Sequence, residues 1–167
     1  MAELKNVKDL LEDEIKDLYS AEKQLTKAIP KMATGAKHPE LKGAFSNHLK
    51  ETEEQLERLE KIAEMLKMKP AGKKCVGMAG VIKEGAEVLE KTGDESILDL
   101  GLIGAGSRVE HYEMAGYLTA ISLAEQMGAG EVATLLKQSL SEEEAAEQKL
   151  RNIASSLLKA APAEIAA

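Results

Sequence analysis

Aromatic residues are scarce in this sequence of 167 residues, which contains no tryptophan and has an aromatic content of 2%. Proteins that bind single-stranded nucleic acid stack the bases on aromatic side chains, and proteins that bind duplexes present a basic surface to the phosphates. The net charge of -7 opposes such a surface. We therefore exclude nucleic acid as a partner.

Cysteine and long hydrophobic runs are also lacking. Cys75 is the only cysteine, which rules out an intrachain disulfide and a thiolate metal cage and suits a reducing compartment. No stretch approaches the run of about eighteen apolar residues that marks a membrane span, and residues 1–9 lack the apolar core of a signal peptide. We expect a cytoplasmic protein with no membrane partner.

Proline occurs four times, and we place these residues near helix boundaries. Alanine, leucine, glutamate and lysine dominate, and no run of β-branched residues alternates with polar ones. These features predict an all-α protein. A chain of this length builds one well-packed core, so we expect a single domain over residues 1–160, followed by a frayed tail over residues 161–167.

Four long segments carry apolar residues at intervals of three and four, the spacing of one buried helix face. The predicted helices cover residues 7–32, 40–68, 95–127 and 131–159. A connector of roughly 25 residues joins the second to the third and has a short helical pattern over residues 81–89. Because this connector can run the length of a bundle, we predict a four-helix bundle with a long crossover that carries a short extra helix.

Three helix ends have local signals. Asn6 is followed three residues later by Asp9, so Asn6 is a predicted N-cap, and Asp94 is a second one. Gly35 suits the C-cap of the first helix.

The third long helix contains four glycines, which lower helix propensity. They are Gly101, Gly104, Gly106 and Gly116. Close approach of a neighbouring helix or of a partner chain explains such a cluster. We expect a homodimer that buries part of this helix.

Each long helix has a glutamate near the middle of its apolar stripe: Glu22, Glu51, Glu113 and Glu143. In each predicted hairpin the two glutamates are nearly equidistant from the turn, so a uniform rise of about 1.5 Å per residue places them at the same height. Four carboxylates are therefore predicted to meet in one layer. Glu110 and Glu147 form a further pair, also centred on the second turn.

Buried carboxylates repel one another unless positive charge compensates them. An oxygen-rich site with some imidazole suits iron or manganese, and two divalent ions supply the required charge. His48 lies one turn before Glu51 and is either a ligand, a hydrogen-bond donor to a ligand, or a hydrogen-bonded core residue. The alternative for the glutamates is that they reach solvent from the rim of the stripe, which explains one such residue better than four at one height.

Five segments together carry a resemblance to a known family: Tyr19–Leu25, His48–Gln55, Lys74–Met78, Val109–Glu113 and Leu140–Glu147. The chain resembles the YciE/YciF-type bacterial ferritin-like proteins. The resemblance implies a ferritin-like four-helix bundle with a long crossover, a dimer, an association with stress responses and a site like that of di-iron carboxylate proteins. Ferritin-like sites generally use Glu-x-x-His on two helices. This sequence has the reverse order, His48-x-x-Glu51, and no histidine in Glu143-x-x-x-Glu147.

The leading hypothesis is a protein with two iron or manganese ions that handles iron with oxygen or peroxide under stress, as a ferroxidase- or peroxidase-like oxidoreductase would. The alternative is a non-enzymatic dimeric helical stress protein without functional metal chemistry, in which the polar layer fixes helix register. The predicted ligands are Glu51 and Glu143 as bridges, Glu22, Glu110 and Glu113 as terminal ligands, and His48 and Glu147 to complete the shell.

Overall fold

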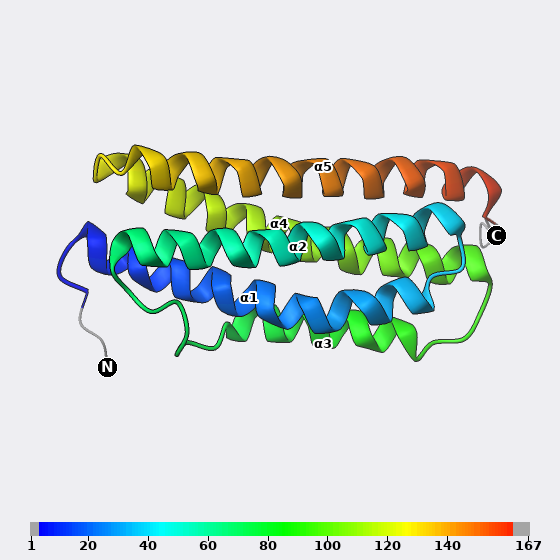
Figure 1. The fold of residues 1–167 in the computed structure, drawn as a ribbon. Helices are drawn as coiled ribbons and strands as arrows, with labels where there is room; N and C mark the ends of the chain where they lie inside the picture. The colour runs from blue at the N-terminus through cyan, green and yellow to red at the C-terminus, as the bar shows by residue number, and fades with distance from the viewer. Residues whose placement is uncertain (1–3, 162–167) are drawn as a thin grey trace, which may run out of the picture.

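The computed structural model describes residues 4–161, and within this range helices are the only regular secondary structure (Figure 1). The helices are α1 (Val7–Gly35), α2 (Pro39–Leu66), α3 (Val76–Leu89), α4 (Glu95–Gln126) and α5 (Gly130–Ala160). The predicted all-α class is confirmed. None of these helices combines the length and the apolar content that crossing a bilayer requires.

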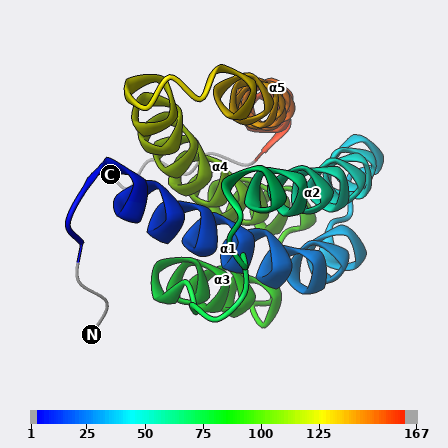
Figure 2. The same cartoon turned by 60° about the vertical axis from the view of Figure 1, so that its left-hand side comes forward.

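The four long helices lie side by side, and each contacts two others. α1 and α2 form one antiparallel hairpin, α4 and α5 form another, and the hairpins meet along α1 with α4 and along α2 with α5. α3 packs on α1 and α4, on the side of α1 away from α5 (Figures 1 and 2). The segment from the end of α2 to the start of α4 therefore returns along the length of the molecule.

The two predicted N-caps are confirmed. The Asn6 side chain accepts a hydrogen bond from the backbone N–H of Asp9 at 3.0 Å. The Asp94 carboxylate accepts from the backbone N–H groups of Ser96 and Ile97. Each cap satisfies donors that the first helical turn leaves without an intrahelical partner.

The end of α1 differs from its prediction in two ways. Pro30 lies inside the helix, not at a boundary, and Gly35 is the last helical residue, with Ala36 as the cap. Burial of Ile29 and Met32 on either side of the proline outweighs its missing N–H. A side chain at Gly35 would overlap Leu89 of α3, so this glycine permits close packing and does not cap the helix.

α3 begins at Val76, five residues before the predicted start. Its N-cap is Cys75, whose buried sulfur accepts from the backbone N–H of Met78 at 3.4 Å. Cysteine is not among the usual capping residues, which explains why the sequence pattern missed this start.

The core consists of two apolar clusters with a polar layer between them. One cluster is built around Leu25, Phe45 and Leu150, the other around Leu18, Leu59 and Leu136. The buried polar side chains of the intervening layer include Glu22, His48, Thr52, Gln55, Glu110, Glu113 and Glu143. The apolar clusters seal this layer at both ends of the molecule.

Three of the four glycines in α4 lie against side chains from other helices of the same chain. A Cβ at Gly101, Gly106 or Gly116 would lie 2.9 Å from Val88, Leu150 or Leu18, respectively. Packing within the chain thus accounts for these glycines, and the homodimer stays a prediction. The boundary at residue 160 also stays a prediction, because the predicted tail, apart from Ala161, lies outside the described residues.

Candidate metal centre

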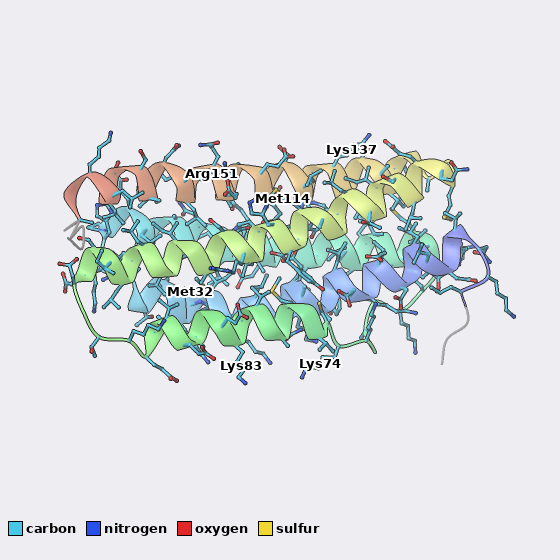
Figure 3. All side chains as sticks on the ribbon, turned by 180° about the vertical axis from the view of Figure 1, so that it is seen from behind. Met32, Lys74, Lys83, Met114, Lys137 and Arg151 are labelled. Atoms are coloured by element: carbon cyan, nitrogen blue, oxygen red, sulfur yellow. The ribbon has the colours of Figure 1, made fainter. Side chains whose placement is uncertain are left out.

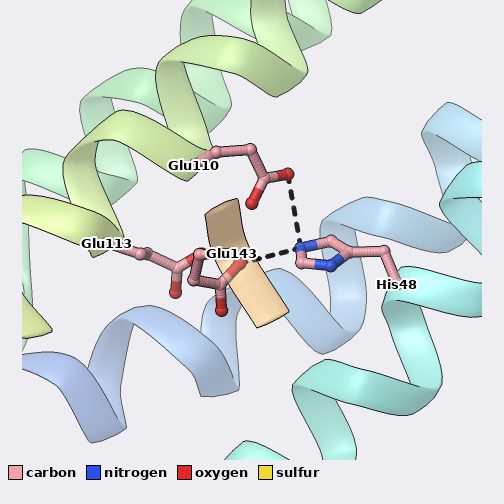
Figure 4. A group of neighbouring side chains, drawn as sticks. All are labelled: His48, Glu110, Glu113 and Glu143. Carbon is pink, nitrogen blue, oxygen red and sulfur yellow. Dashed lines mark ion pairs between the residues drawn. The ribbon is translucent and has the colours of Figure 1, made fainter. Parts of the chain in front are cut away.

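Four buried side chains from three helices converge in the polar layer: His48 of α2, Glu110 and Glu113 of α4, and Glu143 of α5 (Figure 4). One ligand atom from each lies within 4.8 Å of the others. Glu110 and Glu113 can act together because residues three apart on a helix are neighbours on its surface. We refer to these four residues as the metal cluster.

The imidazole of His48 connects the metal cluster to the outside. Its Nε2 lies 3.3 Å from Glu110 Oε1 and 3.6 Å from Glu143 Oε2. Its Nδ1 lies 3.3 Å from Oε2 of Glu51, whose side chain is 42% exposed. His48 therefore stands between buried carboxylates and one that reaches solvent.

Glu22 of α1 adjoins the metal cluster and is completely buried. The Tyr117 hydroxyl, also buried, donates to Glu22 Oε1 at 2.5 Å. The negative charge of Glu22 is, after burial, the largest cause of the raised pKa of Glu113.

Most carboxylate oxygens in this layer have no hydrogen-bond partner. These atoms are both oxygens of Glu113 and of Glu143, and Oε2 of Glu22 and of Glu110. Buried polar atoms are normally paired, and unpaired carboxylates are particularly costly. Carboxylate oxygens with one imidazole nitrogen are a donor set that iron and manganese accept. The layer is therefore a group of residues that could hold a metal ion.

Burial is the main influence on the acids of this layer. It raises the pKa of Glu22, Glu110 and Glu113 well above the ordinary 4.5, and neighbouring carboxylates raise each pKa further. Burial also raises the pKa of Glu143. For His48, burial lowers the pKa, but the hydrogen bond with Glu51 and the charge of Glu143 outweigh it, so the net change is upward.

We expect the metal-free protein to lose stability as the pH rises above 4.5, the ordinary glutamate pKa. Above this pH the folded protein retains protons that the unfolded chain releases. These acids therefore make their full contribution to the free energy of unfolding below pH 4.5, and this contribution declines as the pH rises toward their raised folded-state pKa values. Urea unfolding with chelator at about pH 5 and about pH 8 measures the decline. Glu113→Leu, which lacks one of the acids, should decline less. An unfolding midpoint that rises between the two pH values would contradict this expectation.

The sequence analysis did not predict one buried residue at the edge of the polar layer, Arg58. Arg58 donates to both oxygens of Glu142, each at 2.9 Å, and to Ser139 Oγ at 2.7 Å. Gln55, which is completely buried, donates to Glu142 Oε2 at 3.1 Å. The available signal was spacing, because Gln55 and Arg58 follow His48 at helical intervals along the buried face of α2.

The predicted ligands fall into three groups. His48, Glu110, Glu113 and Glu143 form the metal cluster, and Glu22 adjoins it. Glu51 contacts His48 from the solvent side. Glu147 lies apart: it accepts from Arg151 Nε at 2.7 Å, and His111 Nε2 is 3.6 Å from it. Arg151 is an exposed side chain of α5 (Figure 3). The full set of seven ligands stays a prediction.

The sequence matches a described family and a curated relative over most of its length. The family described as Domain of unknown function (DUF892) matches residues 6–163. "Protein YciF" of Escherichia coli strain K12 is 44% identical over 154 residues, which cover 90% of this chain and 92% of the relative. The resemblance to YciE/YciF-type proteins is thus confirmed.

Solved structures share the fold. The E. coli stress protein YciF superposes with a TM-score of 0.91 at 41% identity, over 93% of this chain and 99% of that one. YcfI from Rhodopseudomonas palustris, described as a putative structural protein, has a TM-score of 0.86 at 38% identity, over 89% and 95% of the two chains. A Xanthomonas campestris protein has a TM-score of 0.74 at 23% identity, over 93% and 95%, and supports the fold alone.

Proposed function

This chain belongs to the family described as Domain of unknown function (DUF892), and we propose that it is a ferritin-like metal protein that handles iron with oxygen or peroxide in stress protection. In this proposal the four long helices are a ferritin-like bundle and the segment with α3 is its crossover. The bundle holds two iron or manganese ions in its polar layer.

One observation carries the proposal: the buried carboxylate oxygens that have no partner. Glu22, Glu110, Glu113 and Glu143 bring a charge of −4 when ionised, and two divalent ions bring +4. A single divalent ion would leave a charge of −2 in a buried layer that apolar clusters cover at both ends. Charge balance therefore favours a site with two ions. The metal cluster would hold one ion, and Glu22 would hold the second ion together with Glu113 and Glu143.

The residues of the chain have separate tasks in such a site. Tyr117 fixes the orientation of Glu22 through its short hydrogen bond. Glu51 fixes the orientation of His48 through Nδ1, which leaves Nε2 facing the carboxylates. The two apolar clusters limit access of water. Bound iron would supply the electron transfer to oxygen or peroxide that none of these side chains supplies alone.

Two relatives support different kinds of function. The E. coli homologue is described as a stress protein, which motivates the proposed role in stress. The Rhodopseudomonas relative is described as a putative structural protein. A structural protein could use protonated acids of the polar layer to fix helix register without metal chemistry. The first function requires bound metal and the second does not, so a measurement of metal binding distinguishes them.

We expect about two Fe²⁺ or Mn²⁺ ions per chain after incubation with an excess of either ion and desalting, with a rise in the melting temperature. Metal analysis and thermal unfolding measure these quantities. Glu143→Gln removes one ligand charge and should lower both. Glu144→Gln is the matched control, because Glu144 is the exposed neighbour of Glu143. Wild-type protein with no bound metal and an unchanged melting temperature would refute the proposed function and favour the structural one.

A further inference from the structure

We infer that Glu51 and His48 form the entry route through which divalent cations pass from solvent to the metal cluster. This inference rests on the proposed function, and it concerns the side of the bundle where α2 faces α5. It gives Glu51 a role outside the coordination shell.

A pocket of about 190 Å³ opens between α2 and α5 beside the metal cluster. His48, Glu51 and Glu110 line it together with Ala146 and Lys149 of α5. The pocket therefore joins one residue that contacts solvent to two residues of the metal cluster. Phe45 and Leu150 of one apolar cluster also line the pocket, so Glu51 and Glu110 are the carboxylates that it offers to an entering ion.

The contacts of His48 continue the route inward. Glu51 is the outer contact at 3.3 Å, and Glu110 and Glu143 are the inner contacts at 3.3 and 3.6 Å. Exposure of the side chains falls along the same path, from 42% for Glu51 to 6% for His48 and 0% for Glu143. His48 Nε2 has no hydrogen-bond partner and can serve as an intermediate ligand.

Two other sides of the layer are lined by completely buried side chains. Glu22 and Tyr117 are completely buried on the α1 and α4 side. On the flank near Arg58, Thr52 and Gln55 are completely buried, and the Arg58 guanidinium is paired with the Glu142 carboxylate, so this ion pair offers an arriving cation no net negative charge. The pocket at His48 is open to solvent and has the Glu51 carboxylate on its lining.

The charge of Glu51 is important at this opening because Lys149 also lines the pocket. Without Glu51, the remaining exposed charge there would be positive and would oppose cation entry. Glu51 is displaced from the metal cluster by the width of the His48 ring, since it contacts the opposite ring nitrogen. It can thus receive an ion and release it inward without remaining a ligand.

The test is stopped-flow binding of Co²⁺, whose visible absorption reports its coordination, to Glu51→Gln and to wild type. A residue that acts only on the entry route lowers the free-energy barrier that the ion crosses, and the ion crosses the same barrier on association and on dissociation. We therefore expect association and dissociation rates to fall by about the same factor, on the order of tenfold. Kd and the final spectrum should stay unchanged, because the glutamine oxygen can still accept from His48 Nδ1 and keep the ring oriented. Glu53→Gln is the matched control, since Glu53 is exposed on the same helix and should leave both rates unchanged.

A second variant tests the route without removing charge. Ala146→Phe places bulk in the pocket and should slow Co²⁺ uptake while leaving its stoichiometry at the wild-type value. A higher Kd with an altered spectrum for Glu51→Gln would make Glu51 a ligand and overturn the inference, as would unchanged rates in both variants. Absence of Co²⁺ binding by wild type would instead refute the metal function itself.

Discussion

Replacing Glu113 with leucine makes the metal-free protein more stable by about 1–4 kcal/mol, because a buried acid that lacks compensation is replaced by an apolar side chain of similar size. Glu113 is completely buried, and neither of its carboxylate oxygens has a hydrogen-bond partner. The substitution also removes the repulsion between Glu113 and the carboxylates of Glu22 and Glu143. After burial, the charges of these two residues are the largest causes of the raised pKa of Glu113. The same variant loses the metal-induced rise in melting temperature, because a ligand is gone.

The measurement is a pair of unfolding curves, with chelator and with anaerobic Fe²⁺, for wild type and Glu113→Leu. Glu144→Leu is the control, because it makes the same chemical change at an exposed position of α5 and should leave both curves unchanged. Equal metal-induced shifts in wild type and Glu113→Leu would remove Glu113 from the metal site. A large loss of stability without metal would show that its carboxyl group is well compensated in the folded chain.

Replacing Arg58 with methionine lowers the free energy of unfolding by about 3 kcal/mol, since removal of one member of a buried ion pair leaves the other uncompensated. Arg58 makes both hydrogen bonds to Glu142 and one to Ser139, and its side chain is 7% exposed. The Glu142 carboxylate would retain Gln55 and Gln138 as donors, neither of which has a charge.

A double variant, Arg58→Met with Glu142→Met, isolates the interaction. We expect it to recover most of the lost stability, because neither charge then remains near the layer. Urea unfolding of the four proteins of this cycle measures the coupling. Lys137→Met is the control, because it breaks an exposed ion pair with Glu125 and should have little effect. Additive losses in the double variant would contradict the proposed coupling of Arg58 with Glu142.

Helix positions and local caps could be predicted from the sequence because both depend on neighbouring residues. Asn6 and Asp94 cap their helices as predicted, through groups two or three residues away. The predictions that Pro30 lies at a helix boundary and that α3 begins at residue 81 were wrong. Both the continuation of α1 past Pro30 and the capping of α3 by a cysteine depend on packing between helices. The local signals gave no information about those contacts.

The composition of the site was predictable in part. The height of a residue along a bundle follows from the rise per residue, so the sequence alone determined that glutamates of different helices lie in one layer. Glu22, Glu113 and Glu143 are found together there. The same reasoning also predicted Glu51 and Glu147 as ligands, because the height of a residue along a helix does not specify the direction in which its side chain points.

Direction was decided only by the tertiary structure. The rotation of each helix about its axis is set by the fit of its apolar face against its neighbours, and this rotation turns Glu51 toward solvent and places His48 inside. It also brings Arg58 of α2 to Glu142 of α5, a pairing between residues far apart in the chain. The sequence thus determined the helices and the level of the acidic layer, whereas packing between helices decided which side chains face one another, because rotation depends on contacts that no single segment contains.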